Sequence, residues 1–143
     1  MSIDVNRVRP AELVALLGGL LLGVAMFLPW FEFSSGNLDA WSSFTVIDVL
    51  LALTAVAGVA LFWLTLTRSS PALPVAAGVW TTLLGVISTL CIGLRLLDHP
   101  AATFDTCVGI WLGLAGSVLV LVGAWVGLND ERPSRRSPAS PAR

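Results

Sequence analysis

The chain has 143 residues, of which 56% are hydrophobic and 12% are charged, and its formal net charge is −1. Soluble domains carry about 25% charged residues, and disordered chains combine low hydrophobicity with high net charge, so this composition excludes both classes. We therefore expect an integral membrane protein with one small domain. Because the net charge is close to zero, no overall field attracts a polyanion, and we expect no nucleic-acid partner.

Four stretches without any charged residue predict transmembrane helices. They cover residues 13–31, 49–67, 69–94 and 106–129. About 20 helical residues cross the ~30 Å hydrocarbon core of a bilayer, and continuously apolar stretches differ from the alternating pattern of barrel strands. The sequence therefore predicts an all-α fold, a four-helix transmembrane bundle in contact with the lipid bilayer, within residues 1–128. The expected spans are about 12–31, 46–67, 73–95 and 105–128.

The segments outside the predicted spans are short. Residues 32–48 form an outer loop segment between the first two helices, and within it residues 33–38 predict a turn or a small hairpin. Residues 68–74 contain two prolines, which are tolerated in a turn or in the first turn of a helix, and so predict a tight hairpin between the second and third spans. Residues 129–143 are rich in Arg, Pro and Ser, a composition typical of a disordered tail.

The arginines predict the orientation of the chain. Four spans place both termini on one side of the membrane, and that side receives seven of the eight arginines, all except Arg95. Basic residues are enriched in cytoplasmic segments. We therefore expect a multi-pass protein of the cell (inner or plasma) membrane with cytoplasmic N and C termini and a cytoplasmic tail.

Aromatic residues gather near the predicted span ends. Those near the first outer junction are Trp30, Phe31, Phe33, Trp41 and Phe44, and those near the inner junction are Phe62, Trp63 and Trp125. Aromatic side chains are common at membrane–water interfaces, so we interpret both groups as interfacial belts.

Small residues predict how the helices pack. Apolar burial does not drive helix association in lipid, so close backbone approach at small residues contributes much of it. The glycines of the fourth span follow one another at spacings of 4, 3, 7 and 4, which keeps them on one helix face. Packing within one chain and a homo-oligomer contact both fit this pattern. The predicted helix-packing residues are Gly19, Gly23, Gly109, Gly113, Gly116, Gly123 and Gly127.

Charged residues are confined to the ends of the predicted spans. An ionisable residue inside the membrane is by default a functional-site hypothesis. The centres of the predicted spans contain no charged residue, which argues against proton-coupled antiport. Asp48 and Arg95 are the charges that we expect to be partly buried, and we predict that they form a charge pair at the outer interface. Asp98 and Asp105 are alternative partners of Arg95, and snorkelling of each charge to water is the competing interpretation.

The remaining reactive side chains are few. Cys91 and Cys107 flank the second outer loop, where a disulfide is conceivable, although free cysteine is also an ordinary buried residue. His99 is the single histidine, and the chain has no Cys-x-x-Cys pair. We therefore expect no metal site, no cofactor and no catalytic residues, and we expect that the protein is not an enzyme.

Several short segments resemble one group of proteins. These segments are Leu28–Phe31, Ala40–Leu50, Ser70–Val75, Arg95–Leu97, Gly109–Leu114, Gly123–Trp125 and Asp130–Arg132. They resemble an uncharacterised group of small four-span membrane proteins of actinobacteria and related soil bacteria. The resemblance covers nearly all of the expected membrane domain. It implies the fold, a membrane location and a bacterial lineage, and it implies no activity and no catalytic residues.

Three hypotheses for the function follow from these observations. The leading one is a non-enzymatic structural or accessory membrane component that packs with another membrane protein or with copies of itself. The alternative is an oligomeric small-molecule transporter or channel, which requires a polar path such as the hydroxyl groups of the third span. An enzyme that acts on lipid at the outer surface requires several outer acids to converge on one pocket.

Overall fold

The computed structural model describes residues 10–33, 36–39, 45–67, 72–97 and 105–130. These residues form four helices and three short strands. The helices are α1 (Pro10–Ala25), α3 (Thr45–Thr67), α4 (Ala72–Leu97) and α5 (Val108–Asp130), and the strands are β1 (Pro29–Phe33), β2 (Gly36–Asp39) and β3 (Asp105–Thr106). The last three helices are long and apolar enough to cross a membrane, whereas α1 is an apolar helix of 16 residues. The fold therefore supports a membrane protein.

Helix α1 ends at Ala25, six residues before the end of the predicted first span. Pro29 explains the early end, because proline disfavours helical geometry in the residue before it and lacks an N–H for the helix. The N–H groups of Phe27 and Leu28 donate to carbonyls three residues back, both at 3.1 Å, which closes the helix with a tighter final turn. The chain then becomes extended as β1.

A three-stranded antiparallel sheet in the order β2-β1-β3 joins the segments that connect the helices. Strands β1 and β2 form a hairpin in which Phe33 pairs with Gly36, as the sequence predicts for residues 33–38. Strand β3 pairs with β1 through Glu32 and Asp105. The sequence did not predict β3, because a two-residue strand is too short to show a period. The all-α expectation therefore holds for the helices, with a small sheet added.

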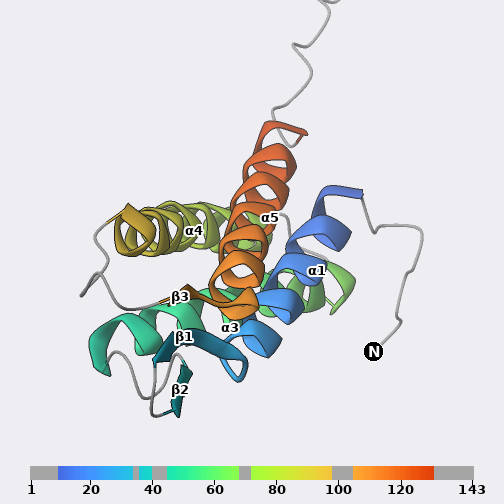
Figure 1. The fold of residues 1–143 in the computed structure, drawn as a ribbon. Helices are drawn as coiled ribbons and strands as arrows, with labels where there is room; N and C mark the ends of the chain where they lie inside the picture. Colours follow the sequence, from blue (N-terminus) through green and yellow to red (C-terminus); the bar gives the residue numbers. More distant parts are fainter. Residues whose placement is uncertain (1–9, 34–35, 40–44, 68–71, 98–104, 131–143) are drawn as a thin grey trace, which may run out of the picture.

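The four helices pack as antiparallel neighbours. Helix α1 lies against α3 and α5, and α4 lies against the same two helices (Figure 1). The three strands lie together where α1 and α4 end, and we call this the sheet end. We call the opposite side the terminal end, because the described chain begins and finishes there with α1 and α5. Helices α3 and α5 also touch across the bundle, and the remaining face of each helix points outward.

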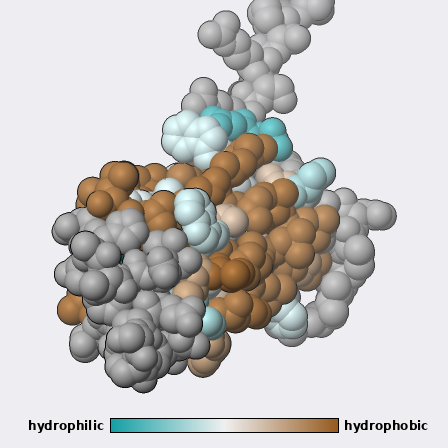
Figure 2. Space-filling view, viewed as in Figure 1, coloured by the Kyte–Doolittle hydropathy of each residue, from teal (hydrophilic) through white to brown (hydrophobic). Residues whose placement is uncertain are grey.

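The outward faces are apolar. On the side that it draws, Figure 2 shows hydrophobic residues over most of the described surface, with the strongest hydrophilic colour near the end of α5. Leu17 on α1, Val56 on α3 and Trp80 on α4 are each at least 60% exposed. A soluble domain would bury such side chains, whereas a lipid-facing helix presents them. The interior is instead rich in small side chains, including Ala15 and Ala124.

Candidate functional site

The closest helix contact joins α1 and α5. A Cβ atom added to Gly116 would lie 2.7 Å from the backbone nitrogen of Leu22, and one added to Gly123 would overlap the backbone of Ala15. Gly18 belongs to the same contact, although the sequence analysis did not single it out. Distances this short leave no room for a side chain, so the two backbones touch directly at these glycines.

A second close contact joins α1 and α3. A Cβ atom added to Gly19 would lie 2.7 Å from the carbonyl oxygen of Ala55, and one added to Gly58 would lie 2.8 Å from that of Ala15. In contrast, the structure gives Gly23 more space, because a Cβ atom there would meet only the Ala55 side chain, at 4.0 Å. Gly23 is therefore a predicted packing residue that does not pack closely within the chain.

Two glycines of α5 that the sequence predicts as packing residues lie against Trp30 and the residue before it. A Cβ atom added to Gly109 would lie 2.5 Å from the carbonyl oxygen of Pro29, and one added to Gly113 would lie 2.9 Å from the indole ring of Trp30. Trp30 is 1% exposed, and its indole N–H donates to the carbonyl of Ala25 at 2.7 Å. Trp30 therefore belongs to the core at the sheet end, and this corrects its expected place in an interfacial belt.

Hydroxyl groups in the interior link neighbouring helices. The hydroxyls of Thr54 on α3 and Ser88 on α4 hydrogen-bond at 2.6 Å, and Thr89 on α4 donates to Ser117 on α5 at 3.1 Å. Thr54 and Ser88 are fully buried. Hydrogen bonds between membrane helices stabilise their association by about 0.6 kcal/mol on average. The hydroxyls of the predicted third span thus face the interior.

Two carboxylates are buried at opposite ends of the helices. Asp48 lies in the first turn of α3 at the sheet end and is 1% exposed, and Glu12 lies in the first turn of α1 at the terminal end and is 7% exposed. A carboxylate in the first turn complements the positive end of a helix dipole. The sequence analysis expected partial burial of Asp48 and missed that of Glu12. The missed signal was the spacing of Glu12 from Ala15 and Gly19, which places it on the packing face.

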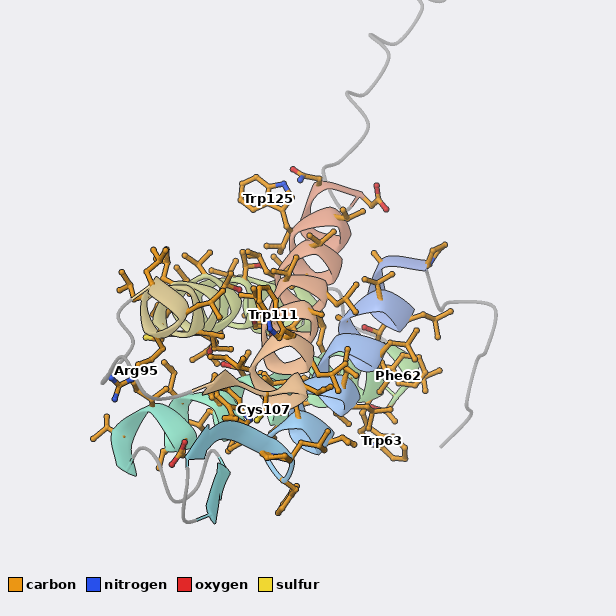
Figure 3. All side chains as sticks on the ribbon, in the orientation of Figure 1. Phe62, Trp63, Arg95, Cys107, Trp111 and Trp125 are labelled. Atoms are coloured by element: carbon orange, nitrogen blue, oxygen red, sulfur yellow. The ribbon has the colours of Figure 1, made fainter. Side chains whose placement is uncertain are left out.

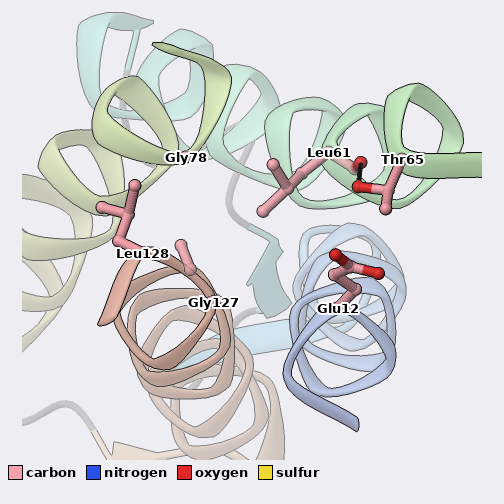
Figure 4. Close-up of a pocket in the computed structure, with 7 residues that line it drawn as sticks. Glu12, Leu61, Thr65, Gly78, Gly127 and Leu128 are labelled. Atoms are coloured by element: carbon pink, nitrogen blue, oxygen red, sulfur yellow. Dashed lines mark hydrogen bonds between the residues drawn. The ribbon is translucent and has the colours of Figure 1, made fainter. Parts of the chain in front are cut away.

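Glu12 borders a small cavity that all four helices line (Figure 4). Its carboxylate lies across from Thr65 on α3, whose hydroxyl donates to the carbonyl of Leu61 at 2.9 Å. The rest of the lining is glycine and apolar side chains, so the polar side chains at this cavity are the Glu12 carboxylate and the Thr65 hydroxyl. The lining residues are Glu12, Leu61, Thr65, Gly78, Ala124, Gly127 and Leu128.

The structure places Asp48 and Arg95 on neighbouring helices at the sheet end. Arg95 lies in the last turn of α4, is half-buried, and borders a groove to which Ile47 of α3 also contributes. Figure 3 shows its side chain beside the start of α3. The Asp48–Arg95 pair stays a prediction. Of the alternative partners, Asp98 lies outside the described residues and Asp105 belongs to β3.

The described residues contain few reactive groups. Cys91 and Cys107 are not joined by a disulfide. Among the described helices and strands, no group of three or more His, Cys, Asp or Glu side chains is arranged to hold a metal ion. His99 lies outside these residues.

Comparison with protein-family models, with curated proteins and with solved structures finds no match to this chain. The resemblance to actinobacterial four-span proteins therefore stays a prediction, and the function is argued from the geometry alone.

Proposed function

We propose that this protein is a non-enzymatic accessory component of the cell membrane, a four-helix transmembrane bundle with cytoplasmic termini that packs against another membrane protein. The single observation that carries this proposal is the space around Gly23. This glycine is part of a Gly-x-x-x-Gly pair, yet only Gly19 of the pair is in close contact within the chain. A close-packing residue that faces open space supports a contact with a second protein.

Gly23 lies on the floor of an apolar groove between α1 and α3. Small residues form the floor, and exposed side chains such as Leu20, Val56 and Phe27 form its walls. A transmembrane helix of another chain fits such a groove, because small floor residues permit close backbone approach and larger walls supply dispersion contacts. The lining residues are Gly19, Leu20, Gly23, Val24, Phe27, Ala55, Val56, Val59 and Ala60.

The bilayer position of α1 is part of the proposal. Sixteen helical residues are about 24 Å long, less than the ~30 Å hydrocarbon core. The apolar residues Met26, Phe27 and Leu28 extend this segment beyond the helix. The packing of α1 along both α3 and α5, which are long enough to span, supports the same depth for α1.

The test is purification of the tagged full-length protein in a gentle detergent, followed by identification of co-purifying chains. We expect a stoichiometric membrane-protein partner with the wild type and its loss with Gly23→Leu, because the added side chain fills the groove. Thermal stability of the variant should stay close to that of the wild type. The matched control is Gly93→Leu, since Gly93 of α4 also has open space within 4 Å of an added Cβ atom.

A wild-type protein that purifies as a single chain would contradict this proposal, as would a partner that Gly23→Leu and Gly93→Leu release equally. A second copy of the chain as the partner would identify a homo-oligomer.

The interior hydroxyls favour a second candidate, an oligomeric transporter or channel. Ser88 and Thr89 of α4 face neighbouring helices, and carboxylates lie at both ends of the same interior. These hydroxyls are engaged in hydrogen bonds, so a conduit requires them to rearrange. Proton or ion flux into liposomes that depends on the protein, and that Glu12→Gln reduces, would support this candidate over the first.

A further inference from the structure

The α1–α3 groove has a floor and a ridge that belong to the same segment of the chain. Gly19 and Gly23 lie on its floor, and Leu20, Val24 and Phe27 form a ridge beside them. The ridge side chains are between 52% and 73% exposed. They follow one another at spacings of four and three, which keeps them on one side of α1 and of the turn after it. This segment therefore offers both a place for close backbone approach and side chains large enough to fill such a place.

A surface with both features is complementary to a copy of itself. Two copies related by a two-fold axis present the same patch to each other, so each must offer a projection where the other offers a depression. Copies of one membrane protein share one orientation in the bilayer. The axis then runs along the bilayer normal, and α1 meets the α1 of the other copy in parallel. Leu20 and Phe27 suit this contact, because they precede and follow Gly23 by three and four residues and so share its face.

The packing of α1 within the chain restricts where a second α1 can cross. Gly19 is closed to a partner, because a Cβ atom added there would lie 2.7 Å from the carbonyl oxygen of Ala55. A Cβ atom added to Gly23 would meet only the Ala55 side chain, at 4.0 Å. Val56 of α3, which is 65% exposed, forms the opposite wall of the groove. A helix that crosses at Gly23 would therefore contact both α1 and α3.

Charge favours this face over the outward face of α4 for a contact between copies. Residues 13–31 and 49–67 contain no charged residue, so two α1–α3 faces meet without the desolvation of a charge. The outward side of α4 instead leads to Arg95, which lies in the last turn of that helix and is half-buried. A parallel two-fold contact along α4 would bring two arginines together, and like charges repel.

We propose that the partner at the α1–α3 groove is a second copy of this chain. The protein is then a two-fold dimer in which the two α1 helices cross at Gly23. Leu20 and Phe27 of each copy lie over Gly23 of the other copy, and Val56 of α3 flanks them. This inference rests on the proposed function, because it names the partner of the same groove.

Disulfide cross-linking of the full-length protein in native membranes tests the dimer. Cys91 and Cys107 are first replaced by serine, and Leu20→Cys or Leu17→Cys is then introduced. These two leucines are a matched pair, because both lie on α1 within one turn and are 52% and 60% exposed, but only Leu20 lines the groove. With a membrane-permeable oxidant, we expect Leu20→Cys to form a covalent dimer and Leu17→Cys to remain mostly a single chain.

A second substitution tests whether the contact depends on the space at Gly23. Gly23→Leu in the Leu20→Cys protein should lower the cross-linked fraction about tenfold, because the added side chain overpacks the crossing point. Gly93→Leu on α4 should leave that fraction unchanged, since a Cβ atom there meets nothing within 4 Å and lies outside the groove. Equal cross-linking of Leu17→Cys and Leu20→Cys, or no effect of Gly23→Leu, would overturn the dimer.

Co-purification with the wild type separates this inference from the proposed function. A different membrane protein that Gly23→Leu releases, without any Leu20→Cys cross-link, would overturn the dimer and leave the proposed function standing. A protein that purifies as a single chain and does not cross-link would overturn both. Phe27→Cys replaces Leu20→Cys as the probe if the latter does not fold, because Phe27 is exposed on the same groove.

Discussion

Gly123 and Gly127 stand one turn apart on α5 but face different surroundings. A Cβ atom at Gly123 would overlap the backbone of Ala15, whereas one at Gly127 would lie 3.9 Å from the side chain of Ala11. The added atom at Gly123 would clash with backbone atoms, whereas the added atom at Gly127 would make an ordinary van der Waals contact. The two glycines of one Gly-x-x-x-Gly pair therefore have different roles, and only a measured distance separates them.

This difference predicts opposite effects of the same substitution. Gly123→Ala should destabilise the protein by about 1–3 kcal/mol, because the backbones of α1 and α5 must move apart. Gly127→Ala should be neutral or stabilise by up to about 1 kcal/mol, because alanine loses less conformational freedom than glycine on folding. Thermal unfolding of both variants in the same detergent checks the prediction. Equal losses of stability would show that α1 and α5 do not approach as closely at Gly123 as described here.

At the scale of elements, Trp30 joins the end of α1, the sheet and the start of α5. Its indole N–H donates to Ala25, its carbonyl accepts from the N–H of Cys107 at 3.0 Å, and its ring lies against Gly113. One residue of β1 thus supplies a second donor to the carbonyl of Ala25, which also accepts from the N–H of Leu28. It also links two segments that are about 75 residues apart in the sequence.

Removal of the indole donor should loosen this junction. Trp30→Phe keeps most of the ring and loses the hydrogen bond to Ala25, so we expect a loss of about 0.5–1.5 kcal/mol. Amide hydrogen exchange should become faster at the end of α1 and in β1. Trp111→Phe is the control, because Trp111 is 53% exposed and stands two residues from Gly113, which puts it on another side of α5. Unchanged exchange in Trp30→Phe would argue against a structural role for the indole N–H.

At the scale of the whole molecule, the helices are arranged so that the termini of the described chain lie together. Helices α1 and α5 pack closely along each other, and each also packs against α3 or α4. The sheet at one end joins the segments that leave α1 and α4. The molecule therefore has one end with a sheet and one end with the start of α1 and the finish of α5, and its side is apolar.

The distribution of arginines predicts which end is cytoplasmic. A fluorescent protein fused to the C terminus should fluoresce, and alkaline phosphatase fused there should be inactive, because both report a cytoplasmic position in a bacterial host. Fusions placed between residues 98 and 104 should give the opposite result. An active C-terminal phosphatase would contradict the proposed orientation.

Much of the architecture follows from local properties of the chain. Charge-free stretches of sufficient length locate the three long helices, because an apolar run of that length has few other stable environments. The turn-forming residues between Phe33 and Leu38 predict the hairpin. The end of α1 was harder to predict from the sequence, because Met26, Phe27 and Leu28 are as apolar as a continuing helix would be. The proline that follows them is the one local signal that the helix ends.

The candidate site depends more on the tertiary structure. The sequence by itself determined the membrane class, the long helices and the set of small residues able to pack, since hydropathy and side-chain size act locally. Only the tertiary structure decided that Gly123 touches backbone while Gly23 faces a groove, that Trp30 is buried, and that Glu12 borders a cavity of four helices. The physical reason is that burial and close contact depend on residues far apart in the chain. The period of a helix shows which residues share a face, but it does not show which residues of another helix that face contacts.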